Sequence, residues 1–175
     1  IRLASLMNIN SSYIFTHDSI YLGEDGPTHQ PIEHLMSLRL IPGVDVIRPS
    51  NSIEINYAYR YLFSNTSNPK VLSLTRQNLK YLDYKVDYEN FVKGGYIVSD
   101  GTDLTIFASG SETNVAFELK ERLNKFSVQI ISVPILNIFN KEKASELISG
   151  NLVFSIELGK STGWYDYVGD ITESF

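Results

Sequence analysis

Residues 16–33 read THDSIYLGEDGPTHQPIE and place two imidazoles, His17 and His29, on either side of a loop rich in glycine and proline. These two residue types favour tight turns, so the loop is expected to be rigid. Before it, the aromatic and β-branched run 13–15 predicts a buried strand. After it, a proline suits the first turn of a helix over residues 33–40. A strand, a polar loop and a helix in this order predict a site at the carboxyl end of a strand in an α/β sheet.

The first 80 residues alternate between helical and extended patterns. Helical apolar spacing predicts a helix within residues 1–8, and Ser52 is the expected N-cap of a second helix. Short apolar runs predict further strands at 44–47 and 71–74, with Arg76 just past the end of the latter. The alternation β-α-β-α-β predicts a parallel sheet, and therefore an α/β fold.

Residues 77–93 mix charges and tyrosines without sustained periodicity, and we interpret residues 81–93 as an interdomain linker. The alternation of strands and helices resumes after it and predicts a second α/β unit. The expected strands lie at 95–98, 104–107, 128–133 and 152–156, and the expected helices begin at Gly110-Ser111, at Lys141 and at Gly163-Trp164.

Composition excludes several classes of protein. The net charge of −5 argues against a nucleic-acid surface, because phosphate binding needs a clustered basic face. The longest apolar stretch, 128–139, is too short and too interrupted to span a bilayer, so we expect no membrane partner. The absence of cysteine rules out disulfides and permits a cytoplasmic origin, which we expect.

The side chains of the loop suit acid–base chemistry. Imidazoles titrate near neutrality, so His17 and His29 can donate a proton to a developing alkoxide and accept one back. The ionised Asp25 can accept a hydrogen bond from a hydroxyl. The alternative is that Asp25 has only a structural role as a turn residue. For Arg76 the alternative is a salt bridge at a domain boundary. Zinc or ferrous iron could also use two imidazoles and a carboxylate, but spacings of eight and four residues match no standard ligand pattern.

The loop resembles the transketolase family, thiamine diphosphate enzymes that move two-carbon ketol units between sugar phosphates. The resemblance is carried by residues 16–20 and 23–33 and extends along nearly the whole chain. Further matching segments are Arg2-Leu3, Leu6-Met7, Arg48-Pro49, Arg76-Gln77-Asn78-Leu79, Lys93-Gly94-Gly95-Tyr96, Gly110-Ser111-Glu112 and Gly163-Trp164. It implies parallel-sheet three-layer units: the latter half of a pyrimidine-binding domain over 1–80, the linker 81–93, and a truncated C-terminal domain over 94–175.

The resemblance also implies roles for four residues. His17 and His29 would be catalytic and contact the sugar carbonyl and hydroxyls, Asp25 would bind a sugar hydroxyl, and Arg76 would bind the terminal phosphate. The implied cofactors are thiamine diphosphate and a divalent cation, magnesium or calcium, whose ligands would precede residue 1. The implied partners are sugar phosphates and a second subunit in a homodimer. Tyr21 departs from the small residue usual in the family, which could narrow the pocket.

Family members are several times longer, so we expect this chain to be a fragment that is inactive alone. Two alternatives stay open beside a transketolase of the pentose phosphate pathway. One is a non-catalytic scaffold or interaction module. The other is a formaldehyde-accepting ketol transferase, which shares these motifs and differs in its acceptor.

Overall fold

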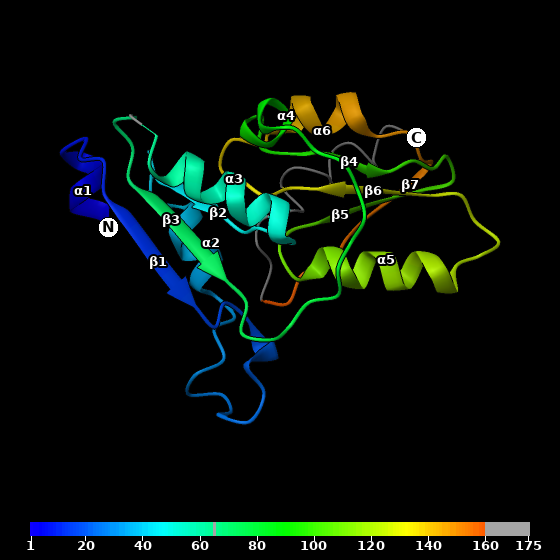
Figure 1. Cartoon of the computed structure of the whole chain (residues 1–175), viewed down its shortest axis with the longest axis horizontal. Helices are drawn as coiled ribbons and strands as arrows, with labels where there is room; N and C mark the ends of the chain where they lie inside the picture. The colour runs from blue at the N-terminus through cyan, green and yellow to red at the C-terminus, as the bar shows by residue number, and fades with distance from the viewer. Residues whose placement is uncertain (65, 160–175) are drawn as a thin grey trace.

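The computed structural model describes residues 1–64 and 66–159, which form two α/β units side by side (Figure 1). In the first unit, three strands pair in the order β1-β3-β2, all parallel. Helix α3 packs on β3, and α2 packs on β2. The elements of this unit are α1 (Arg2–Leu6), β1 (Ser12–Thr16), the 3₁₀ helix η1 (Ile20–Leu22), α2 (His34–Arg39), β2 (Asp45–Ile47), α3 (Ser52–Leu62) and β3 (Lys70–Leu74).

The second unit has four strands in the order β4-β6-β5-β7, with α5 on one face and α4 and α6 on the other (Figure 1). Together the two units confirm the α/β class predicted from the alternating pattern. The elements of this unit are α4 (Tyr88–Val92), β4 (Tyr96–Ser99), β5 (Leu104–Ala108), α5 (Glu112–Arg122), β6 (Val128–Ser132), α6 (Lys141–Leu147) and β7 (Leu152–Ser155). The helix expected at Gly163-Trp164 lies outside the described residues.

The second sheet is mixed rather than wholly parallel. Strand β4 runs antiparallel to β6, while β5 is parallel to both β6 and β7. The reason is the short connection 100–103, which joins β4 to β5. Two consecutive strands that run in the same direction need a crossover of a dozen or more residues, so β4 runs opposite to β5 and therefore to β6. The connection crosses the start of β6 so closely that a Cβ at Gly101 would lie 2.1 Å from the carbonyl carbon of Val128. Only glycine fits there.

Two local expectations are corrected, and one helix forms in a segment where none was expected. Strand β1 forms where expected, but it is an edge strand of the described sheet, so Ile14 is 48% exposed rather than buried. The N-cap of α3 is Asn51, not Ser52: the Asn51 side chain accepts a hydrogen bond of 2.9 Å from the Glu54 amide. Helix α4 lies in the segment interpreted as linker, and Asp87 caps it by accepting from the Asn90 amide.

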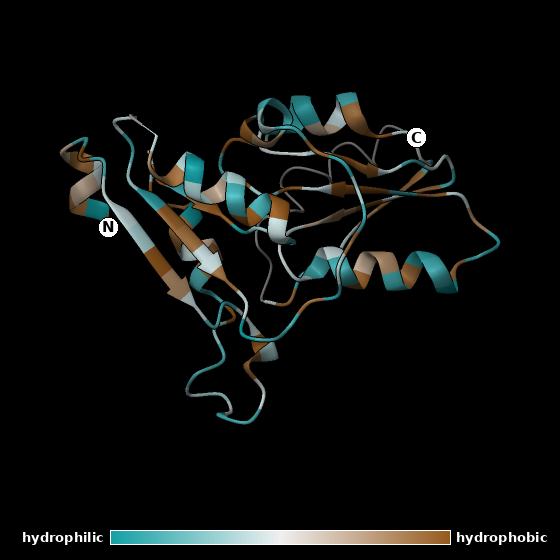
Figure 2. Ribbon diagram, in the orientation of Figure 1, coloured by the Kyte–Doolittle hydropathy of each residue, from teal (hydrophilic) through white to brown (hydrophobic). Residues whose placement is uncertain are grey.

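The two units share one apolar core. Val46 and Val71 of the first sheet belong to the same buried cluster as Phe107, Ile131 and Phe139 of the second unit. Figure 2 shows hydrophobic residues along β3 and β6, which lie inside their sheets. Burial of such side chains is the main favourable term in folding, so the two units stabilise each other. The domain limits at residues 80 and 94 stay a prediction.

A buried carboxylate also joins the units. Glu54 on α3 is fully buried, and its two oxygens accept hydrogen bonds from five donors. Those donors are the amide and hydroxyl of Ser50, the hydroxyls of Tyr84 and Tyr96, and the hydroxyl of Ser132. A buried charge is tolerated only when it is hydrogen-bonded in this way. Glu54 therefore fastens α3 to β4, to β6 and to the segment that precedes α4.

Candidate functional site

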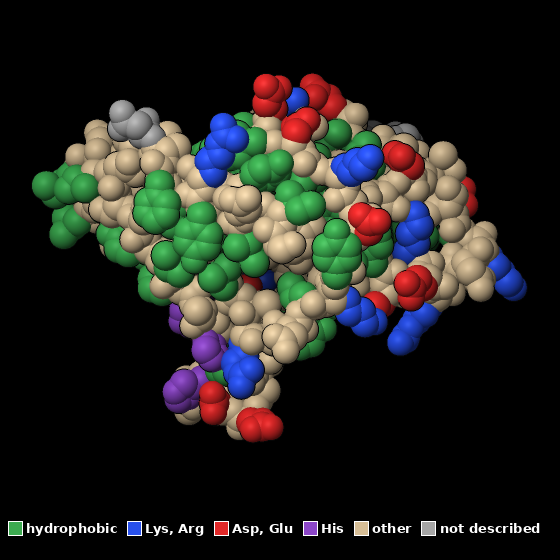
Figure 3. All heavy atoms as spheres, in the orientation of Figure 1, with side chains coloured by type: hydrophobic (Ala, Val, Ile, Leu, Met, Phe, Trp, Pro, Cys, Tyr) green, Lys and Arg blue, Asp and Glu red, His purple; other side chains and the backbone are tan. Residues whose placement is uncertain are grey.

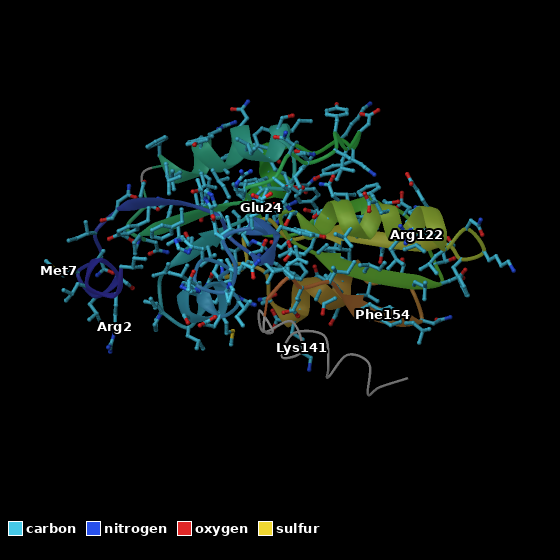
Figure 4. The ribbon with its side chains drawn as sticks, turned by 90° about the horizontal axis from the view of Figure 1, so that it is seen from below. Arg2, Met7, Glu24, Arg122, Lys141 and Phe154 are labelled. Atoms are coloured by element: carbon cyan, nitrogen blue, oxygen red, sulfur yellow. The ribbon has the colours of Figure 1, made fainter. Side chains whose placement is uncertain are left out.

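A cleft of about 850 Å³ opens at the carboxyl end of β1, where the sequence predicts the site. The loop that follows β1 projects from the body of the molecule, and Figure 3 shows histidine side chains gathered on this projection, next to acidic ones. Figure 4, seen from below, shows Glu24 of this loop over the middle of the molecule. The cleft is lined by His17, Asp18, His29, Glu33 and His34, together with apolar and small polar residues of β1, β3 and α2.

His17 ends β1 with an unusual backbone. Its φ angle is +65°, in the left-handed region that costs a non-glycine residue roughly 1–2 kcal/mol. Because the chain turns sharply there, the His17 side chain stays exposed in the cleft while the next residue, Asp18, is buried at 7% exposure. The His17 Nδ1 atom lies 2.7 Å from the hydroxyl oxygen of Thr16.

His29 is held by turns. Its amide donates to the Gly26 carbonyl at 3.1 Å, and the Gly26 amide donates to Gly23 at the same distance. The side-chain Nε2 of Gln30 donates to the backbone carbonyls of Ile20 and Gly23, which connects the two ends of the loop. The His29 Nδ1 atom lies 2.9 Å from the hydroxyl of Thr28. The loop thus brings His29 to the same cleft as His17, as the sequence predicted.

Asp25 and Arg76 are placed differently. Both are exposed, and neither lines the cleft. Asp25 lies in the turn, where its backbone carbonyl accepts a 3.4 Å contact from the Thr28 hydroxyl. Arg76 follows β3 by two residues, and β3 pairs in parallel with β1 so that Leu74 stands opposite Thr16. Arg76 and His17 therefore both lie beyond the carboxyl ends of neighbouring strands. Only His17 of the two lines the cleft.

Sequence reasoning missed a buried ion cluster behind the cleft. Arg48, which follows β2, donates from Nη2 to Asp18 at 2.7 Å and from Nη1 to Glu112 at 2.8 Å. Burial alone disfavours a charged guanidinium, but the two carboxylates outweigh that effect and raise the pKa of Arg48. Gly110 leaves room for the cluster: its φ is +58°, and a Cβ there would lie 3.2 Å from the Arg48 guanidinium carbon. An arginine directly after a buried strand was the available signal.

The Glu112 carboxylate lies at the start of α5. The sequence predicted a helix that begins at Gly110-Ser111, and α5 begins at Glu112. The Ser111 hydroxyl donates to Glu112 at 3.1 Å, and Ser111 makes no side-chain cap bond to the helix. The Glu112 carboxylate therefore accepts hydrogen bonds from Ser111 and Arg48.

Within residues 1–64 and 66–159, no group of three or more histidine, aspartate or glutamate side chains could hold a metal ion. The alternative use of His17, Asp25 and His29 as metal ligands therefore has no support from the geometry. In the same residues, no helix has the length and apolar character needed to cross a membrane.

The fold and the cleft define a class: an α/β protein of two sheet units, with paired imidazoles beyond a parallel strand. Residues 1–81 match the transketolase pyrimidine-binding domain, and residues 94–175 match the transketolase-like C-terminal domain. The chain belongs to the transketolase family.

Full-length relatives and solved structures show how much of the family the chain covers. It is 41% identical to the transketolase of Halalkalibacterium halodurans, over 97% of this chain and 27% of that protein. A transketolase structure from Leishmania mexicana has a TM-score of 0.86 at 36% identity, covering 95% of this chain and 26% of that one. A Pichia stipitis transketolase in complex with sedoheptulose-7-phosphate has a TM-score of 0.84 at 36% identity, covering 93% and 25%. The chain spans about a quarter of the length of these relatives.

Proposed function

We propose that the protein acts as a transketolase, transferring a two-carbon ketol group from a ketose phosphate to an aldose phosphate in the pentose phosphate pathway. The observation that carries the proposal is the placement of His17 and His29 on one cleft. Each imidazole uses Nδ1 for the hydroxyl of the preceding threonine, and no described residue hydrogen-bonds to Nε2. Two Nε2 atoms are therefore available to a substrate.

The chemistry follows from what imidazoles can do. When the ketose carbonyl is attacked, its oxygen gains negative charge, and an N–H donor placed beforehand stabilises that charge. A group that titrates near neutrality can also give the oxygen a proton and take one back when the carbon–carbon bond breaks. His17 and His29 fit both tasks, and holding the sugar between them supplies orientation as well.

Asp25 and Arg76 belong to the proposal as substrate-binding residues. An ionised carboxylate accepts a hydrogen bond from one sugar hydroxyl and so discriminates between stereoisomers. A planar guanidinium matches a terminal phosphate with two parallel donors. Their exposure in this chain leaves both side chains free to face a bound sugar phosphate.

The cofactors are thiamine diphosphate and a divalent cation, magnesium or calcium. Thiamine diphosphate supplies the carbon nucleophile that attacks the ketose. The described residues contain no group fit to hold the metal, so we place the metal and diphosphate ligands in other parts of the protein. The residues of this chain then bind the sugar, orient it and handle its protons. As in the family, we propose a homodimer that works in the cytoplasm.

The test is ketol transfer by the full-length protein carrying His29→Ala. We expect turnover to fall by about two orders of magnitude or more, the usual contribution of a general acid–base group. Lys125→Ala, an exposed change after α5, is the control and should leave turnover unchanged. Unaltered steady-state kinetics in His29→Ala would remove His29 from the mechanism.

A non-catalytic role as a scaffold or interaction module is the second candidate. Titration of the full-length protein with thiamine diphosphate and a ketose phosphate separates the two candidates. Absence of binding would support a scaffold or interaction module.

A further inference from the structure

The shape of the cleft depends on how the loop after β1 is held. All residues that line it belong to the first unit, between Ile1 and Ser73. One of the two proposed catalytic imidazoles, His17, sits on a left-handed backbone that a non-glycine residue does not adopt unaided. Such a conformation persists only when its surroundings impose it, and a fixed neighbour of His17 can supply that constraint.

Asp18 is that neighbour. Its Oδ2 atom accepts from two nitrogens of Arg48, Nε at 3.0 Å and Nη2 at 2.7 Å. Both side chains are almost completely buried, at 2% and 1% exposure. Both bonds end on the same oxygen and fix its position, because a guanidinium presents its donors in one plane, while Oδ1 has no hydrogen-bond partner among the described residues.

Arg48 is in turn fixed from the second unit. Its third nitrogen, Nη1, donates to Glu112 at 2.8 Å and to the Ser109 carbonyl at 3.3 Å. Glu112 also accepts from the Leu158 amide at 3.2 Å, just beyond β7. One guanidinium therefore links the loop after β1 to the start of α5.

Stability alone does not account for this cluster. Removing two carboxylates and an arginine from water is costly, and apolar replacements of buried ion pairs are often neutral or stabilising. What the cluster supplies is geometry: three nitrogens of Arg48 are committed to two carboxylates on different units. The adjacent residue on the loop is the one whose backbone needs support.

We propose that Arg48 is a positioning residue, which fixes the imidazole of His17 through Asp18 and makes that position depend on Glu112 of the second unit. The inference rests on the proposed function for its catalytic consequence. The second unit then contributes to the reaction without touching the substrate, because it holds the far end of the guanidinium.

The test compares Arg48→Lys with wild type in the full-length protein. A lysine keeps the positive charge, but a single ammonium cannot reproduce three planar donors to two carboxylates. We expect kcat to fall at least tenfold, and the crystal structure of the variant to show the His17 ring displaced and its backbone outside the left-handed region. The control is Lys80→Met, which breaks the exposed pair between Lys80 and Glu118 that joins the same two units. It should leave kcat and His17 unchanged.

If Arg48→Lys does not fold, the same measurements on Glu112→Gln test the inference. This substitution keeps the shape of the side chain and one acceptor oxygen, but removes the negative charge. There we expect a threefold to tenfold fall in kcat with a displaced His17. An unmoved His17 in the deciding variant would overturn the inference, whatever its activity. Failure of wild type to transfer ketol groups would instead contradict the proposed function, and the position of His17 in the crystals would still test the inference.

Discussion

The Nδ1 atom of His29 lies 2.9 Å from the hydroxyl oxygen of Thr28. The same arrangement recurs across the loop, where His17 Nδ1 lies 2.7 Å from the Thr16 hydroxyl. In each pair the threonine directly precedes the histidine, so the contact is local and does not depend on distant packing. It occupies one ring nitrogen and leaves the other to the cleft.

Thr28→Val tests the value of that contact. Valine keeps the shape and removes the hydroxyl, so the His29 ring loses one neutral hydrogen bond of about 0.5–1.5 kcal/mol. We expect kcat of the full-length protein to fall by about twofold to tenfold, which is that energy expressed as a rate. Steady-state kinetics measure it, and Thr28→Ser should restore most of the loss. Equal rates for the valine and serine variants would contradict the role of the hydroxyl.

Arg76→Ala addresses phosphate recognition. If the guanidinium binds the terminal phosphate, KM for phosphorylated sugars should rise about tenfold to a hundredfold, the value of a charge-assisted hydrogen bond. Unphosphorylated sugars should be converted as by wild type, because they never make the contact. Equal losses for both substrate types would defeat the assignment.

The alternation of apolar runs was enough to predict the strands of both units, because buried strands carry their own pattern. The loop with His17 and His29 could also be predicted, since its turns depend on local glycine and proline. The long-range pairing of the strands could not be predicted from the sequence. The antiparallel β4 follows from a short connection that crosses β6, and the exposure of β1 depends on its place in the sheet.

The same limit hid the polar contacts between the units. Glu54 lies 30 residues from Tyr84, 42 from Tyr96 and 78 from Ser132 in sequence. Nothing in a helix that carries one glutamate indicates that this side chain is buried and accepts bonds from such distant donors. Asp18 and Arg48 are hidden for the same reason, since 30 residues separate them.

Glu54→Gln measures the contribution of the buried carboxylate to stability. The change removes a charge and places an amide group among donors, leaving at least one of the buried hydroxyls without an acceptor. We expect the free energy of unfolding to fall by on the order of 3 kcal/mol, measured by denaturant titration. Glu118→Gln is the matched control, because it removes an exposed carboxylate paired with Lys80, and exposed ion pairs contribute little to stability. Similar losses in both variants would show that burial of Glu54 matters little.

The tyrosines around Glu54 predict a response to alkaline pH. Burial, and then the charge of Glu54, raise the pKa of Tyr96 and of Tyr84 above the ordinary tyrosine value. Above about pH 10 the unfolded chain loses these protons while the folded chain keeps them, so stability is full below that pH and falls as pH rises.

Tyr96→Phe should therefore change the slope as well as the level. We expect the variant to be less stable at pH 7, by about 1.5–3 kcal/mol for a lost hydrogen bond to a carboxylate. Between pH 10 and 11.5, its stability should fall less steeply with pH than that of wild type. Thermal unfolding across this range measures both, and parallel slopes would contradict the shifted tyrosine.

In the proposed reaction, His17 and His29 hold the reacting carbons of a sugar between them. The most direct measurement is a crystal structure of the full-length protein with thiamine diphosphate and a ketose phosphate bound. We predict the Nε2 atoms of both residues within about 3.2 Å of the sugar's carbonyl or hydroxyl oxygens. A sugar bound with both imidazoles turned away from it would contradict the account.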